Sequence, residues 1–164
     1  MDTRRLSELA LLTAVSLIMF IIEMQLPPIV PVPGVKLGLA NIITVYAVYA
    51  YTPKEAALIF TVRIIIGSLF SGNIMGLIFS VCGGLLCLGG MILIKKFTDI
   101  KMIVFASVAG AVLHNIGQTA AAIVVMKTTA VIYYLPFLLF SGCIAGAFTG
   151  VCALLIIKRL KGNK

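Results

Sequence analysis

The residue best suited to binding a small molecule is an arginine in the middle of an apolar run. Arg63 lies about nine residues into the run 55–70, which at about 1.5 Å per residue places it near the centre of a membrane-spanning helix. An arginine there costs on the order of 3 kcal/mol. A carboxylate, backbone carbonyls, a water-filled cavity or an anionic ligand must offset that cost. Pairing with Glu23, the one acidic residue deep in a run and away from the charged ends, and a ligand-binding role are both open.

A second group of polar residues lies in the run 102–126. His114 and Gln118 are four residues apart, and Asn115 and Gln118 are three apart, so one turn of helix can present all three from adjacent faces. They lie about 18 to 24 Å along a helix that begins near Met102. Buried polar groups of this kind need partners. The partners are either the other helices, as polar glue, or a ligand.

The predicted binding site combines these groups into one cavity that opens to the outside of the cell. Amide and hydroxyl groups from the run 37–51 reach a similar depth, and two tyrosines start the last run. Those tyrosines suit either an interfacial aromatic belt or a stacking wall at the cavity mouth. The full predicted set is Lys36, Asn41, Thr44, Arg63, Asn73, His114, Asn115, Gln118, Tyr133 and Tyr134.

The elements that position these residues follow from the composition. Of the 164 residues, 62% are hydrophobic and 11% are charged, whereas soluble domains are roughly a quarter charged. A membrane span needs about 20 apolar residues. The sequence therefore predicts an all-α membrane protein, a compact bundle of six transmembrane helices in a single domain, 1–164. The predicted spans are 6–24, 37–51, 55–70, 74–94, 102–126 and 130–157, with a semi-rigid proline loop at 25–36.

The positive charges predict the orientation in the membrane. With the N-terminus inside, ten Lys and Arg residues are cytoplasmic, against Lys36 and Lys127 outside. The positive-inside rule then places both termini in the cytoplasm. The net charge of +8 does not indicate nucleic-acid binding, because the basic residues lie at the ends of apolar runs rather than in a patch on a soluble face.

Two stripes of small residues predict close helix packing, because small side chains let backbones approach in lipid. Gly142, Gly146 and Gly150 share one face of the last run and predict a packing seam inside the bundle. Ser7, Ala10 and Ala14 share a face of the first run, where packing inside the bundle and docking of a partner subunit are both open. The cysteines form no C-x-x-C pair, so we expect neither a metal site nor a cofactor.

Four stretches of the chain resemble a known family. They are PGVKLGLANI at 33–42, RIIIGSLFSGN at 63–73, GAVLHNIGQ at 110–118 and YYLPFLLFSG at 133–142. The chain is similar to the Gx transporter family, also called heptaprenyl diphosphate synthase component I. It thereby resembles the S components of energy-coupling-factor (ECF) uptake transporters, which are multi-pass proteins of the prokaryotic cell membrane.

The resemblance implies a function and a set of partners. An S component binds a small substrate outside the cell and docks, here through Ala10 and Ala14, onto a transmembrane coupling subunit that two ATPase subunits drive. The chain has no G-x-x-x-x-G-K-[ST] phosphate loop of its own, so ATP hydrolysis is expected in those partners. The expected cargo is a small anionic or amphipathic metabolite related to vitamins, flavins, quinones or isoprenoids.

Two other functions are open from the sequence. The chain is alternatively a noncatalytic membrane component of prenyl diphosphate or quinone biosynthesis, or a scaffold in a redox pathway. Catalysis of prenyl transfer needs clustered acidic residues to hold magnesium and diphosphate. No two acidic residues here lie within five positions of each other, so we do not expect an enzyme.

Overall fold

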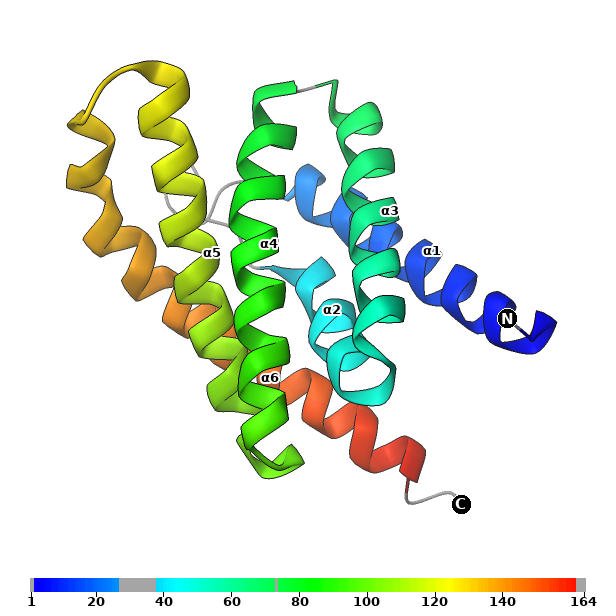
Figure 1. The fold of residues 1–164 in the computed structure, drawn as a ribbon. Helices are drawn as coiled ribbons and strands as arrows, with labels where there is room; N and C mark the ends of the chain where they lie inside the picture. The colour runs from blue at the N-terminus through cyan, green and yellow to red at the C-terminus, as the bar shows by residue number, and fades with distance from the viewer. Residues whose placement is uncertain (1, 27–37, 73, 162–164) are drawn as a thin grey trace.

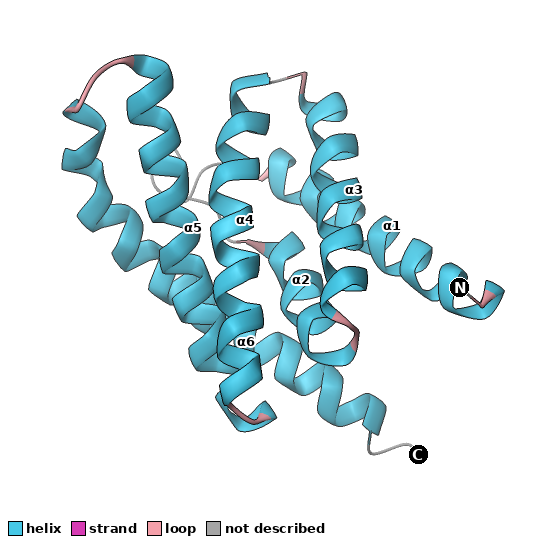
Figure 2. Cartoon of the chain, viewed as in Figure 1, coloured by secondary structure: helices cyan, strands magenta, loops and turns pink. Residues whose placement is uncertain are grey.

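The computed structural model describes residues 2–26, 38–72 and 74–161, and every regular element in these ranges is a helix (Figure 1, Figure 2). This confirms the all-α prediction. The α-helices are α1 (Thr3–Gln25), α2 (Leu39–Ala50), α3 (Pro53–Ser71), α4 (Ile74–Phe97), α5 (Ile103–Met126) and α6 (Leu135–Lys161). Two 3₁₀ turns, η1 (Ile100–Met102) and η2 (Ala130–Tyr134), lead into α5 and α6.

The helix lengths are compatible with a multi-pass membrane protein. Four helical segments are long and apolar enough to cross a bilayer: Thr3–Gln25, Ile74–Phe97, Ile100–Met126 and Ala130–Leu160. The segment α3 has 19 residues, three of them charged, and α2 has only 12. At about 1.5 Å per residue α2 is about 18 Å long, which is shorter than a hydrocarbon core of about 30 Å. The predicted run 37–51 therefore does not form a full span by itself.

The helix boundaries differ from the predicted runs for local chemical reasons. The third helix begins earlier than predicted, because Thr52 and Glu55 form a reciprocal capping box and Pro53 fits the first turn. The last run is divided into two elements. A 3₁₀ turn at Ala130–Tyr134 precedes the α-helix, which begins at Leu135 and has Pro136 in its first turn. Most of the predicted proline loop, 27–36, lies outside the described residues.

The longer helices pack around the short helix α2. Helices α3, α4 and α5 stand side by side, and α6 crosses at an angle next to α5 (Figure 1). Helix α1 contacts α2 and α3. Helix α2 begins near the middle of the bundle and packs against α1, α3, α4 and α6.

Side chains from other helices hold both ends of α2. The Glu23 carboxylate at the end of α1 accepts hydrogen bonds from the backbone N–H groups of Gly38 (2.6 Å) and Leu39 (3.0 Å). At the other end, Lys95 of α4 donates from Nζ to the carbonyls of Val48 (2.6 Å) and Tyr51 (3.2 Å). A negative charge near the N-terminus of a helix and a positive charge near its C-terminus both stabilise the helix dipole. These contacts fix α2 between α1 and α4.

A charged cluster ties the start of α1 to the start of α3. Arg5 donates to both carboxylate oxygens of Glu55, from Nε at 2.7 Å and from Nη2 at 3.1 Å. Its guanidinium also lies 4.3 Å from the centre of the Tyr51 ring. Bidentate pairs of this kind are geometrically specific. The N-terminal half of α1 is thus anchored at one edge, while its other faces stay open.

The glycine stripe of α6 lies against α5. A Cβ atom built on Gly146 would come within 2.8 Å of the Val108 Cα, and one on Gly150 within 2.8 Å of the Val104 Cα. A Cβ on Gly142 would collide with the Asn115 amide. The two helices therefore meet at backbone distance, which only glycine permits. A buried hydrogen bond of 2.9 Å between Ser107 and Thr149 crosses the same interface.

The substitution Gly146→Val is expected to lower the free energy of unfolding by about 1 to 3 kcal/mol, because its new atoms meet α5 backbone rather than a movable side chain. Thermal unfolding of the purified protein in detergent measures this. The control is Gly89→Ala in α4, where an added Cβ meets no atom within 4 Å. An unchanged melting temperature for Gly146→Val would contradict the close α5–α6 contact.

Candidate ligand-binding cavity

A cavity of about 330 Å³ lies between the helices. Residues of all six α-helices line it, together with Gly38, which directly precedes α2. Its volume falls in the range of small-molecule sites. Among its polar lining residues are Glu23, Asn41, Arg63, Ser68, Ser80, Ser107, His114, Asn115, Gln118 and Thr149. Arg63, Asn41 and the three polar residues of α5 were predicted to share one cavity, and the structure brings them together.

The sequence of α3 places Arg63 inside the bundle. The buried residues of this helix are Ala56, Ile59, Phe60, Arg63, Ile64 and Gly67. Their spacing of three and four residues marks a single face of a helix. Arg63 lies in the middle of that apolar stripe, so the packing that buries its neighbours also carries the guanidinium into the bundle.

Arg63 is 8% exposed and only partly satisfied by the protein. Its Nη1 donates to Asn41 Oδ1 at 3.3 Å, and its guanidinium lies 5.5 Å from the centre of the Phe60 ring. Its Nε is buried without a hydrogen-bond partner in the described part of the chain. The predicted alternative of pairing with Glu23 is not what the structure shows, since the Glu23 carboxylate is hydrogen-bonded at the start of α2.

The α5 group combines a structural role with a place in the lining. Asn115 donates from Nδ2 to the Leu138 carbonyl of α6 at 2.6 Å, and Gln118 donates to Asn115 Oδ1 at 3.3 Å. The His114 ring lies over Gly83 of α4, where an added Cβ would approach it to 3.2 Å. Asn115 is therefore helix glue, as one alternative held, and it also presents its amide edge to the cavity.

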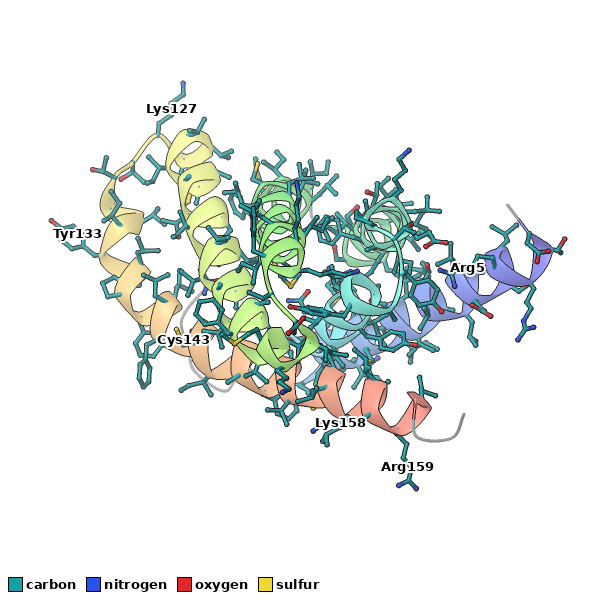
Figure 3. The ribbon with its side chains drawn as sticks, turned by 60° about the horizontal axis from the view of Figure 1, so that its bottom comes forward. Arg5, Lys127, Tyr133, Cys143, Lys158 and Arg159 are labelled. Atoms are coloured by element: carbon teal, nitrogen blue, oxygen red, sulfur yellow. The ribbon has the colours of Figure 1, made fainter. Side chains whose placement is uncertain are left out.

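Several predicted site residues lie elsewhere. Thr44 is buried at 2% exposure in α2, outside the lining, and its hydroxyl has no partner among the described residues. Tyr133 and Tyr134 are 87% and 53% exposed and do not line the cavity. Tyr133 points away from the bundle (Figure 3), which fits an aromatic belt better than a stacking wall. Lys36 and Asn73 are outside the described residues.

The predicted docking residues are on the surface. Ser7, Ala10 and Ala14 are all exposed, so they do not pack inside the bundle. Only 11% of the most apolar window of α1 is buried, against 28% to 33% in the other three long apolar segments. Helix α1 thus presents most of its apolar surface outward.

Sequence reasoning missed the hydroxyl groups of the cavity and the role of Glu23. Ser68, Ser80, Ser107 and Thr149 line it, yet serine and threonine are common in apolar helices and gave no distinct signal. Glu23 had a usable signal, because a carboxylate at the end of one helix can cap the start of the next. Its assignment as a partner for Arg63 overlooked that use.

The family of proteins described as heptaprenyl diphosphate synthase component I matches residues 12–156. The chain belongs to this family. The region that matches the heptaprenyl diphosphate synthase component I family contains every described residue that lines the cavity. Of the exposed stripe on α1, Ala14 is inside the matched region and Ser7 and Ala10 precede it. The chain matches neither a curated protein nor a solved structure.

Proposed function

We propose that this chain is the substrate-binding S subunit of an ECF-type, ATP-driven uptake transporter. It captures a small anionic or amphipathic metabolite from outside the cell, and separate ATPase subunits supply the energy. The observation that carries the proposal is Arg63, a buried guanidinium at the wall of a cavity of about 330 Å³ with an N–H group that no described residue satisfies. A buried charge retained at such a cost is typical of a binding site.

The surface of the bundle supports a location in the cell membrane. Large apolar side chains are exposed on every long helix, among them Ile18, Leu69, Val124 and Phe140, at 56% to 75% exposure. Such extensive apolar surface suits lipid rather than water. We place both termini in the cytoplasm on the excess of positive charge. In that orientation the part of the cavity lined by Met24, Ser71 and Gly76 is on the outer side.

The exposed face of α1 supports docking onto a coupling subunit. Ser7, Ala10 and Ala14 leave a shallow strip of small side chains on a helix that packs mainly against α2 and α3 in the described part of the chain. Small residues allow a partner helix to approach closely. In our proposal this strip receives the transmembrane coupling subunit, which two ATPase subunits drive.

The description of the family supports a second candidate, a noncatalytic membrane component of prenyl diphosphate or quinone synthesis. Prenyl transfer uses grouped acidic residues with magnesium. The described residues contain no group of three or more His, Cys, Asp or Glu that could hold a metal ion. In this second role the chain would assist a separate catalytic subunit and would gain no stability from small metabolites.

Thermal stabilisation by a deproteinised small-molecule extract of the source cells tests the proposed function. A ligand at 100 times its Kd adds about 2.7 kcal/mol to the free energy of unfolding, so the melting temperature should rise by several degrees. Native mass spectrometry of the stabilised protein then reports the bound mass. If no extract fraction stabilises the protein and no small molecule is retained, the transport proposal is wrong and the second candidate is favoured.

A further inference from the structure

One edge of the Arg63 guanidinium is hydrogen-bonded by the protein, and the other edge is buried without a hydrogen-bond partner among the described residues. Nη1 donates to Asn41 Oδ1, whereas Nε has no partner and Nη2 makes no hydrogen bond to a described residue. The N–H groups of Nε and Nη2 are parallel and form a fork that matches two oxygen atoms of one oxyanion. Solvent does not reach Nε, so an oxygen that enters with a ligand and displaces the covering side chains would be its first partner.

The charges around the cavity favour an anion with a single negative charge. Among the described lining residues, the acidic and basic side chains are those of Glu23, Arg63 and His114. The Glu23 carboxylate already accepts two backbone hydrogen bonds at the start of α2. One guanidinium balances one negative charge, whereas a phosphate monoester brings about 1.5 to 2 at neutral pH. The surplus charge would be buried without a partner, which is strongly unfavourable.

The rest of the lining suits an uncharged ligand body. Phe20, Met24, Leu77 and Met91 supply apolar and sulfur surface, and Asn115 and Gln118 present amide groups. Such surfaces bind a compact, mostly apolar body with a few hydrogen-bonding groups. The anionic group and the body of the ligand thus meet different parts of the cavity.

We propose that the ligand of this cavity is a small monocarboxylate whose carboxylate group sits on the Nε and Nη2 fork of Arg63. The inference rests on the proposed binding function and narrows its substrate class. A monocarboxylate site excludes cations as ligands. It also excludes phosphate and diphosphate esters, which the description of the family would suggest.

Chemical treatment of the extract tests the proposal on the unmodified protein. One portion is treated with carbodiimide and methylamine, which converts carboxylates into neutral amides, and a second portion with phosphatase. We expect the rise in melting temperature to disappear with the first treatment and to survive the second. Survival after amide formation, or loss after phosphatase alone, overturns the carboxylate assignment while leaving a binding function in place. An untreated extract that never stabilises the protein instead refutes the proposed function itself.

Two amide-to-carboxylate variants, one at Asn41 and one outside the cavity, test the fork directly. Asn41→Asp puts a carboxylate 3.3 Å from Nη1, where it neutralises the guanidinium from inside the protein and competes with the ligand. We expect the affinity, measured by titrating the untreated extract, to fall at least about tenfold for Asn41→Asp. The control is Gln25→Glu, which makes the same amide-to-carboxylate change at an exposed residue outside the cavity lining and should retain affinity within about threefold. Equal affinities for the two variants would overturn the proposal, and the treated extracts decide the matter should Asn41→Asp fail to fold.

Discussion

Replacing Arg63 with methionine is expected to abolish stabilisation of the protein by the cell extract without weakening the unliganded fold. Losing a buried, charge-assisted contact costs about 2 to 5 kcal/mol, so the affinity should fall by about 30-fold or more. The unliganded bundle loses a buried cation with an unsatisfied N–H group and gains an apolar side chain, which is neutral or stabilising. Differential scanning fluorimetry with and without extract measures both effects.

Arg159→Met is the matched control for this variant. Arg159 is exposed and points away from the bundle (Figure 3), so its loss should change neither stability nor binding. An arginine that only holds the helices together would affect the stability of the unliganded protein and not its ligand binding. If Arg63→Met lowers the melting temperature of the unliganded protein and the extract still stabilises it, then Arg63 holds the helices together and the binding proposal loses its main support.

Replacing Ala14 with phenylalanine is expected to prevent assembly with the coupling subunit while leaving ligand binding intact. Ala14 is exposed, so a phenylalanine ring at this position can point out of the bundle. It would fill the strip through which a partner helix approaches closely. We expect at least a tenfold fall in recovery of the coupling subunit by affinity purification from native membranes, with unchanged stabilisation by the extract.

Ala120→Phe provides the comparison, because Ala120 is also exposed on a helix but lies on α5, away from the α1 strip. It should purify with the coupling subunit as the original chain does. Loss of assembly in both variants would mean that any added ring disturbs the complex. Retention in both would place the docking surface elsewhere on the molecule.

The strongest sequence signals concerned residues whose environment is decided by a single helix. The depth of Arg63 in its apolar run and the three polar residues of one α5 turn predicted a shared cavity, since helical rise and spacing fix the depth and the face of each residue. Glycines at intervals of four likewise predicted close contact, and they lie against α5. In these cases the 3.6-residue period of the helix was sufficient to predict which side chains meet.

Features that depend on two helices meeting could not be predicted in the same way. The capping of α2 by Lys95 joins residues 47 positions apart, and nothing in either local sequence indicates the partner. The run 37–51 was predicted as a span although its 15 residues are few for one, and the helix is shorter still, with 12 residues from Leu39 to Ala50. The tyrosines of η2 failed as lining residues because a 3₁₀ turn, rather than a continuous helix, sets their direction.

Helix α1 carries both the small-residue strip and the carboxylate that caps α2. Ala14 and Glu23 are nine residues apart, which is about 13 Å along one rigid helix. Tilting α1 from its exposed side would pull Glu23 away from the N–H groups of Gly38 and Leu39, one turn before Asn41 and the guanidinium it holds. A force applied to the exposed side of α1 would therefore weaken the contacts that hold the start of α2 and the Arg63 guanidinium at the cavity wall.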